Sequence, residues 1–282
     1  MRVYYNERQG QPGETPRLNL EALARRVKGA YSSFARGDYF QKAFGYYCVD
    51  AHDVEGEVAS DLKGHFYLEA GINVERSIDE FLQEAAEVEL FTFIEFVHDY
   101  VAKPDPDSGR YHSYMQCGMH YDWRNSRFDV EAGRSEWRDK INSVLKYYGE
   151  GFALTAPGEI VRLAPPGTEE LLATEPPAKA GDVNVAKLRN AIKTFRRGLA
   201  SREERKQAIR DLVDLLEFYR PQVKAYLLRK DEAELFSIAN NFALRHHRPD
   251  QRDDYTDPWL NWLFYLYLAT VHLVLDLSHR EP

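Results

Sequence analysis

Cysteine is scarce in this chain, and an excess of positive charge is absent. Two cysteines in 282 residues are too few for a disulfide-stabilised secreted fold. Because no N-terminal signal pattern is present either, we expect a reducing, cytoplasmic environment. The formal net charge of −8 excludes indiscriminate coating of nucleic acids, which needs a broadly basic surface, although it leaves room for a local basic cleft.

Several catalytic signatures are also missing. The sequence contains no P-loop, no dinucleotide-binding fingerprint, and no GxSxG or HExxH pattern. ATP hydrolysis, hydride transfer and serine-hydrolase chemistry therefore lack support, and we predict a main site without a cofactor or a metal ion. What the chain does contain, 44% hydrophobic and 29% charged residues, is typical of a globular protein with a substantial core.

One apolar segment, residues 259–277, is long enough to be tested as a membrane span. It carries Asn261, Thr270, His272 and Asp276, and no bias of lysine or arginine flanks it. We interpret it as a buried core helix and expect no membrane partner, with a transmembrane helix as the alternative.

Helical periodicity and turn residues predict the elements of the N-terminal half. Ser77 and Glu80 form a capping box that starts a long helix over 77–101. Its predicted inward set is Phe81, Leu82, Ala85, Val88, Phe91, Ile94 and Val97. The other predicted elements are a helix over 20–33, a short helix within 39–47, a loop-rich insert over 105–133, a helix over 135–148 and a β-hairpin over 152–163 that turns at Pro157-Gly158.

Proline and glycine mark residues 164–183 as a linker. Beyond it, four helices are predicted, over 185–198, 201–219, 231–247 and 258–277, and their short connections favour an up-and-down bundle. We therefore predict a mainly α protein: an N-terminal α+β module over 1–163 with a small hairpin, the linker, and a four-helix bundle over 184–282.

A dense polar cluster at the end of the 231–247 helix is the main candidate site. It contains Asn241, Arg245, His246 and His247. An arginine can neutralise a phosphate and a histidine can move protons near pH 7, so such a pair can cleave RNA without a metal, using the 2′-hydroxyl as internal nucleophile. The alternative is structural, because cationic side chains are favoured at a helix C-terminus.

Three stretches carry a resemblance to known families. The segment NNFALRHH, with the polar loop and apolar helix after it, resembles the HEPN class of four-helix bundles found in abortive-infection and toxin proteins. The segments ELFTFIEFVHDYV and WRDKINSVLKYYGEGFALTAPGEIVRL are similar to the N-terminal module of AbiJ-type abortive-infection proteins. Together the resemblances cover residues 80–277.

The resemblance implies an antiphage defence protein that acts as a metal-independent endoribonuclease, works as a homodimer, and has RNA or a co-encoded protein as its partner. Arg245 would hold the phosphate, His246 would exchange protons, and Asn241 and His247 would orient the substrate. The chain departs from the HEPN pattern, in which an arginine precedes the histidine by four to six residues, because positions 240–242 are Asn, Asn and Phe. The alternative function is therefore a non-catalytic component that binds nucleic acid or protein through a degenerate site.

Two pairs of metal-binding residue types form a second candidate. Cys48 with His52, and Cys117 with His120, could together bind zinc, or the cysteines could be small buried hydrophobic residues.

Two further stretches could contact RNA. The insert from Tyr111 to Trp123 mixes aromatic residues with nearby arginines, which suits base stacking but also suits a satellite aromatic cluster. The basic run from Arg196 to Arg210 is the densest in the chain. We interpret it as a solvated helix face and, if RNA binds, as its electrostatic footprint.

Overall fold

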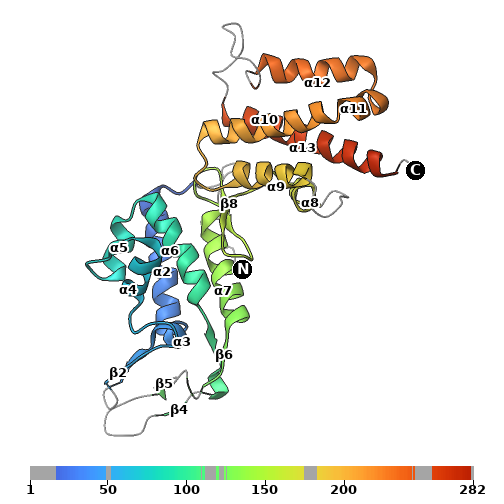
Figure 1. The fold of residues 1–282 in the computed structure, drawn as a ribbon. Coiled ribbons are helices and arrows are strands. Elements are labelled where there is room, and N and C mark those ends of the chain that lie inside the picture. Colours follow the sequence, from blue (N-terminus) through green and yellow to red (C-terminus); the bar gives the residue numbers. More distant parts are fainter. Residues whose placement is uncertain are drawn as a thin grey trace, which may run out of the picture. The chain divides into compact units, whose positions relative to one another are not determined.

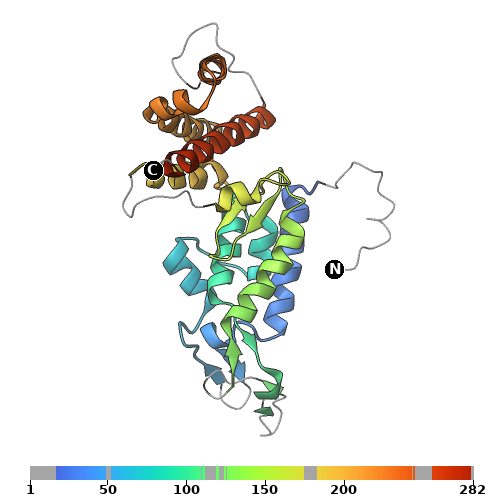
Figure 2. The same cartoon turned by 90° about the vertical axis from the view of Figure 1, so that its right-hand side faces the viewer.

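The fold is mainly helical, and the chain divides into two compact units, residues 1–163 and 164–282, at the start of the predicted linker (Figures 1 and 2). The small strands of the described part form antiparallel pairs. The computed structural model describes residues 17–48, 52–108, 110–111, 119–120, 124, 126–174, 183–242, 244 and 256–280.

The first unit contains helices of nine to seventeen residues joined by shorter helices and strand pairs. Its helices are α2 (Leu20–Arg36), α3 (Gln41–Phe44), α4 (Leu62–Ala70), α5 (Ile78–Glu84), α6 (Glu87–Tyr100) and α7 (Val130–Leu145), with a 3₁₀ turn η1 (Pro106–Ser108). Its strands are β1 (Tyr46–Cys48), β2 (His52–Val54), β3 (Lys103–Pro104), β4 (Arg110–Tyr111), β5 (Met119–His120), β6 (Phe128–Asp129), β7 (Phe152–Leu154) and β8 (Ile160–Arg162).

The core of this unit lies between α2, α6 and α7, which Figure 1 shows side by side. Trp137 of α7 is fully buried and donates its indole N–H to the carbonyl oxygen of Ile94 on α6 at 3.0 Å. Phe34 of α2 meets the same indole edge-on, with ring centroids 5.2 Å apart. A large aromatic side chain whose polar atom is also satisfied fixes how the three helices pack.

The predicted long helix over 77–101 is wrong in one respect, because the chain breaks at Ala85–Ala86. Both alanines adopt extended ψ angles, and α6 starts anew with Glu89 accepting from the backbone N–H of Ala86 at 2.8 Å. The break shifts the helical phase, so Val88, predicted to face inward, is 56% exposed. The predicted capping box at Ser77 and Glu80 is confirmed.

The predicted hairpin over 152–163 is confirmed, with β7 and β8 pairing in antiparallel register. Asn142 of α7 fixes it: its side chain accepts from the N–H of Leu154 at 2.7 Å and donates to the carbonyl of the same residue at 3.0 Å. The predicted insert over 105–133 ends earlier than expected, since α7 begins at Val130, where Asp129 caps it through the N–H of Ala132.

The secondary-structure elements in the described part of the second unit are all helices. Its helices are α8 (Glu169–Ala173), α9 (Val183–Arg196), α10 (Arg202–Phe218), α11 (Arg220–Tyr226), α12 (Arg229–Asn241) and α13 (Asp257–Arg280). The four predicted helices correspond to α9, α10, α12 and α13, whereas α8, inside the predicted linker, and α11 were missed. Helix α11 follows α10 after one residue, Tyr219, and carries Pro221 in its first turn, where proline is tolerated.

Helix α10 packs against both α9 and α13 at the centre of this unit. Phe195 of α9 stacks on Phe264 of α13 with an interplanar angle of 4°. Tyr267, fully buried on α13, donates its hydroxyl to the carbonyl of Leu235 on α12 at 3.0 Å. This hydrogen bond links α12 to the core. The burial of apolar faces, rather than helix propensity, therefore holds the bundle together.

Helix α13 is the one helix of the described residues long and apolar enough to cross a membrane by length and composition. Half of its most apolar window is buried inside the unit. The buried side chains recur at helical spacing and belong to the core: Leu260, Leu263, Phe264, Tyr267, Leu268, Val271 and Val274. This burial makes α13 part of the hydrophobic core of the second unit.

Candidate functional site

The predicted polar cluster begins at the end of α12. Asn241 is the last residue of this helix and is exposed, and Phe242 follows as the C-cap. Arg245, His246 and His247 lie outside the described residues. The structure therefore describes the residues that lead into the candidate segment, Asn241, Phe242 and Leu244.

One hydrogen bond anchors Leu244, the last described residue before the candidate segment, to α10. Arg210 donates from Nε to the carbonyl oxygen of Leu244 at 3.1 Å, and the Leu244 side chain is only 2% exposed. The Leu244 N–H in turn donates to the carbonyl of Ala239 at 3.1 Å. The residue directly before Arg245 is thus held by its side chain, its N–H and its carbonyl, which fixes where the candidate segment leaves the bundle.

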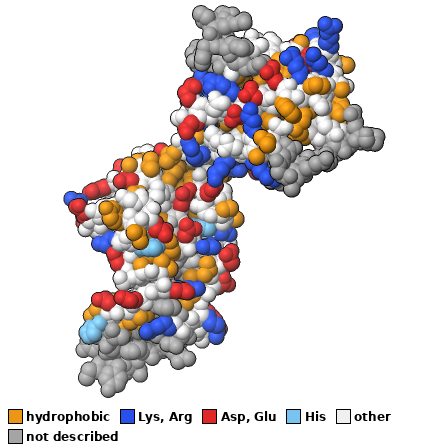
Figure 3. Space-filling view, viewed as in Figure 1, with side chains coloured by type: hydrophobic (Ala, Val, Ile, Leu, Met, Phe, Trp, Pro, Cys, Tyr) orange, Lys and Arg blue, Asp and Glu red, His pale blue; other side chains and the backbone are white. Residues whose placement is uncertain are grey.

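The basic run around the start of α10 is extensively paired with acidic residues. Arg197 bonds to Glu204, and with the cap residue Ser201 it lowers the pKa of the Glu204 carboxyl to about 2. Lys206 lies 3.5 Å from Glu203 and is itself only 3% exposed. Blue and red side chains are correspondingly intermingled on the face of the second unit shown in Figure 3.

Arg205 shows that the predicted solvated face is partly wrong. Its side chain is buried, and its guanidinium lies 4.7 Å from the ring of Phe195. It donates to Asp257 at 2.9 Å and to Asn261 at 2.7 Å, both on α13. A planar guanidinium can satisfy a carboxylate, an amide and an aromatic face together, so Arg205 joins three helices as part of the structure. Sequence reasoning read a run of charges and missed this burial.

An exposed aromatic depression lies at the start of α13, lined by Pro258, Trp259 and Trp262. The two indole rings are perpendicular, with centroids 5.8 Å apart. Phe242 packs against both, at 5.4 Å from Trp259 and 6.1 Å from Trp262. Trp259 and Trp262 are 37% and 44% exposed. Because Phe242 follows Asn241 directly, the depression lies next to the residue at which the predicted polar cluster begins.

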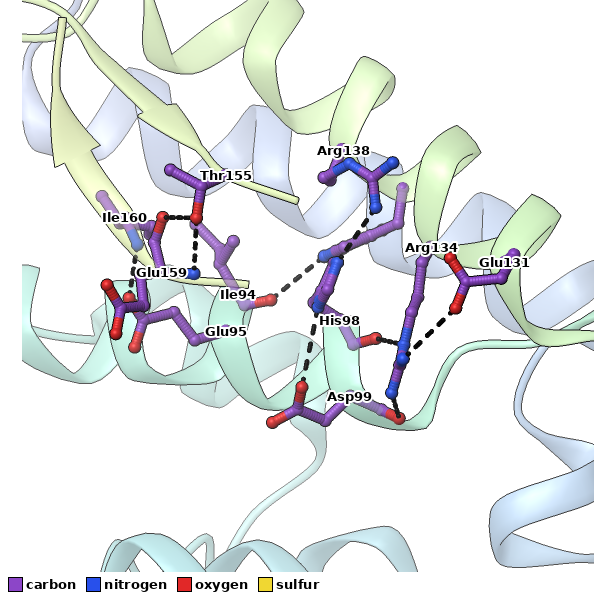
Figure 4. Close-up of polar contacts among 11 residues, drawn as sticks. Ile94, Glu95, His98, Asp99, Glu131, Arg134, Arg138, Thr155, Glu159 and Ile160 are labelled. Carbon is purple, nitrogen blue, oxygen red and sulfur yellow. Dashed lines mark hydrogen bonds and ion pairs between the residues drawn. The ribbon is translucent and has the colours of Figure 1, made fainter. Parts of the chain in front are cut away.

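A second polar site, missed by sequence reasoning, is centred on His98 in the first unit (Figure 4). Its imidazole is buried on α6, and Arg138 of α7 approaches Nε2 at 3.3 Å. A guanidinium only donates, so Nε2 accepts and Nδ1 carries the hydrogen. Nδ1 has no hydrogen-bond partner, although Asp99 Oδ1 lies 3.6 Å away.

The β7–β8 turn covers this imidazole. A Cβ atom on Gly158 would lie 2.5 Å from Nδ1 of His98, and Gly158 has a φ of +93°. One helical turn before His98, Glu95 accepts from the N–H of Ile160 in the same hairpin at 2.6 Å. The packing of Gly158 on His98 and the hydrogen bond from Ile160 to Glu95 therefore hold the hairpin against α6.

Burial sets the ionisation of both groups. Desolvation lowers the pKa of His98, helped by Arg134 and Arg138 and opposed by Asp99. Desolvation also raises the pKa of Glu95, opposed by its hydrogen bond from Ile160. His98 is accordingly neutral near pH 7, and its closed surroundings favour a structural role over proton transfer to a ligand.

The predicted zinc ligands are only partly described. Cys48 is buried, and His52 lies directly across from it in the β1–β2 pair. His120 belongs to β5, whereas Cys117 lies outside the described residues. Among the described residues, no group of three or more histidine, cysteine or acidic side chains could hold a metal ion. Most of the predicted stacking insert, from 112 to 118 and from 121 to 123, also lies outside them.

Comparison of the chain with protein-family models, curated proteins and solved structures found no match. The function is therefore argued from the chain's own residues and from the motif resemblances above.

Proposed function

We propose that this protein is a defence-type endoribonuclease that cuts RNA without a metal ion, with its site at the connection between α12 and α13. The observation that supports it most is the anchoring of Leu244 by Arg210. A catalytic segment must leave a rigid scaffold at a fixed point, and this hydrogen bond provides such a point directly before Arg245.

The chemistry follows from the residue types. Arg245 neutralises the scissile phosphate, and His246 takes the proton of the RNA 2′-hydroxyl as the 2′-oxygen bonds to phosphorus. The bond from phosphorus to the 5′-oxygen breaks, and that oxygen receives a proton from the imidazolium. Asn241, exposed at the end of α12, and His247 orient the strand. The products carry a 2′,3′-cyclic phosphate and a 5′-hydroxyl.

The helical fold of the second unit supports the HEPN resemblance, since the predicted polar segment follows α12 and precedes α13 in the sequence. That resemblance also implies a homodimer in which two sites meet, and the scarcity of cysteine favours the cytoplasm as its location. Analytical ultracentrifugation of the purified chain tests the dimer: a single monomer species at micromolar concentration would refute it.

The test of activity is incubation of the purified protein with total RNA and with tRNA, in the presence and absence of EDTA, beside His246→Ala. We expect cleavage that persists in EDTA and is lost in the variant. Circular dichroism of both proteins is the control, since this variant should keep the helical fold. Equal cleavage by the variant would refute the assignment of His246.

One observation favours the alternative, a non-catalytic binding protein with a degenerate site. Arginine and lysine side chains around the start of α10 already contact carboxylates: Arg197 contacts Glu204, Lys206 contacts Glu203, and Arg205 contacts Asp257. RNA would have to compete with these ion pairs for the cations. RNA binding by wild type and His246→Ala alike, without cleavage by either, would favour this alternative.

A further inference from the structure

The aromatic depression at the start of α13 has a geometry that the bundle core does not require. Trp259 and Trp262 are three residues apart on α13 and lie outside its buried stripe. Their indole rings stand at 90° to each other. Large aromatic side chains normally stabilise a protein by burial, so two neighbouring exposed indoles indicate a binding surface.

Phe242 packs against both indoles. Its ring is tilted by 33° to Trp259 and by 57° to Trp262. The two perpendicular indoles thus present an apolar wall and floor for a flat ring.

The size and surroundings of the depression indicate its occupant. A stable interface with a second copy of the chain needs about 800 Å² and about 20–30 residues on each side, whereas Pro258, Trp259 and Trp262 line this depression. A single planar ring fits such a site better. A partly exposed cation lies next to it, because Arg202, 36% exposed, is 3.7 Å from Asp257, the residue before Pro258.

The chain itself keeps this depression close to the predicted catalytic residues. His246 is four residues from Phe242, and four residues span at most about 14 Å. A single RNA strand can therefore contact both places at once.

Resting on the ribonuclease function proposed above, we infer that the depression of Pro258, Trp259 and Trp262 binds an unpaired nucleobase, and that the substrate is single-stranded RNA. Stacking of a base on an aromatic side chain tolerates any base, so the site selects for unpaired strands rather than for a sequence. An RNA duplex offers no free base face, so it gains no affinity from the depression.

The test is binding of a fluorescently labelled single-stranded RNA by fluorescence anisotropy, in wild type, Trp262→Ala, Trp262→Tyr and Leu273→Ala. Leu273 is a matched control, since it is as exposed as Trp262, at 44%, on the same helix. We expect the Kd to rise about tenfold in Trp262→Ala, to return most of the way in Trp262→Tyr, and to stay unchanged in Leu273→Ala. Binding of a duplex of the same sequence should be equal in all four proteins.

Three results would overturn the inference. If wild type binds and cleaves RNA but Trp262→Ala binds the single strand equally well, the proposed function stands and the stacking site fails. If Trp262→Ala loses single-stranded and duplex binding alike, the tryptophan does not select unpaired bases. If wild type neither binds nor cleaves RNA, the proposed function fails and the inference fails with it. Sedimentation of the four proteins without RNA is the control for self-association. We expect the same oligomeric state in all four.

Discussion

Arg210 of α10 holds the carbonyl oxygen of Leu244 at 3.1 Å, and Leu244 is the residue from which the candidate segment departs. The guanidinium also lies 3.8 Å from Glu203, about two turns earlier on its own helix. The same side chain thus connects the acidic and basic residues of α10 to the proposed catalytic segment.

Replacing Arg210 by Ala should reduce RNA cleavage at least several-fold, because the backbone before Arg245 loses its anchor. The loss of one partly exposed hydrogen bond should lower the free energy of unfolding by only about 1 kcal/mol. Single-turnover cleavage rates and urea unfolding measure the two effects. Glu203→Gln is the control, since it removes the ion pair and keeps the bond to Leu244. Equal activity of Arg210→Ala and wild type would show that the anchor is irrelevant.

Gly158→Ala should destabilise the first unit by about 2–4 kcal/mol. The added Cβ would lie 2.5 Å from the buried imidazole of His98 in a left-handed backbone conformation, so overpacking adds to strain. Gly71→Ala is the matched control: Gly71 also has a positive φ, +69°, but a Cβ there meets nothing within 4 Å. Chemical denaturation measures both, and equal costs would argue against the close packing of Gly158 on His98.

The stability of the first unit should fall on acidification through His98. Its pKa is lowered in the folded state by burial, so the folded protein binds fewer protons than the unfolded chain. The stabilisation from neutral His98 is therefore present above the unfolded pKa of about 6.5 and is lost below it, by at most about 1.4 kcal/mol per pH unit.

His98→Asn should remove this part of the slope between pH 7 and pH 5. Glu95 contributes the opposite sign, since its pKa is raised, but it is common to both proteins and cancels in the comparison. Free energies of unfolding at several pH values test the prediction. Parallel pH profiles for the two proteins would contradict it.

Arg205 and Arg202 both contact the carboxylate of Asp257, but they should contribute differently to the free energy of unfolding of the second unit. Arg205→Ala should cost about 2–3 kcal/mol, because Asp257 and Asn261 lose a buried donor. Arg202→Ala should cost less than about 1 kcal/mol, since this side chain is 36% exposed and 3.7 Å from Asp257. Thermal unfolding of the two variants compares them. Equal shifts in Tm would mean that the burial of Arg205 is not what matters.

Local signals predicted much of the fold. The capping box at Ser77 starts a helix, and Pro157-Gly158 sits in the turn of the predicted hairpin. Each depends on residues a few positions apart, which a sequence displays directly. The break at Ala85–Ala86 was missed because alanine favours helix, and Glu89 as a cap acceptor is recognisable only once a break is suspected.

The polar and aromatic sites depend on contacts between residues far apart in the sequence, which local residue spacing does not reveal. His98 and Gly158 are sixty positions apart in the sequence, and their contact requires the packing of the hairpin on α6. Arg205 looked solvated because its neighbours are charged, whereas its partners Asp257 and Asn261 come from α13. The pair Trp259 and Trp262 was visible as an i, i+3 spacing, but Phe242, which supports it, comes from another helix.

The most direct test of the central claim is the chemistry of the RNA ends produced in EDTA. Products of wild-type cleavage should carry a 5′-hydroxyl and a 2′,3′-cyclic phosphate, detected by end-labelling with and without phosphatase treatment, and they should be absent with His246→Ala. Those ends require attack by the 2′-oxygen, as the proposed roles of Arg245 and His246 demand. Products with 5′-phosphate ends, cleavage that stops in EDTA, or no cleavage of RNA by the wild-type protein would contradict the account.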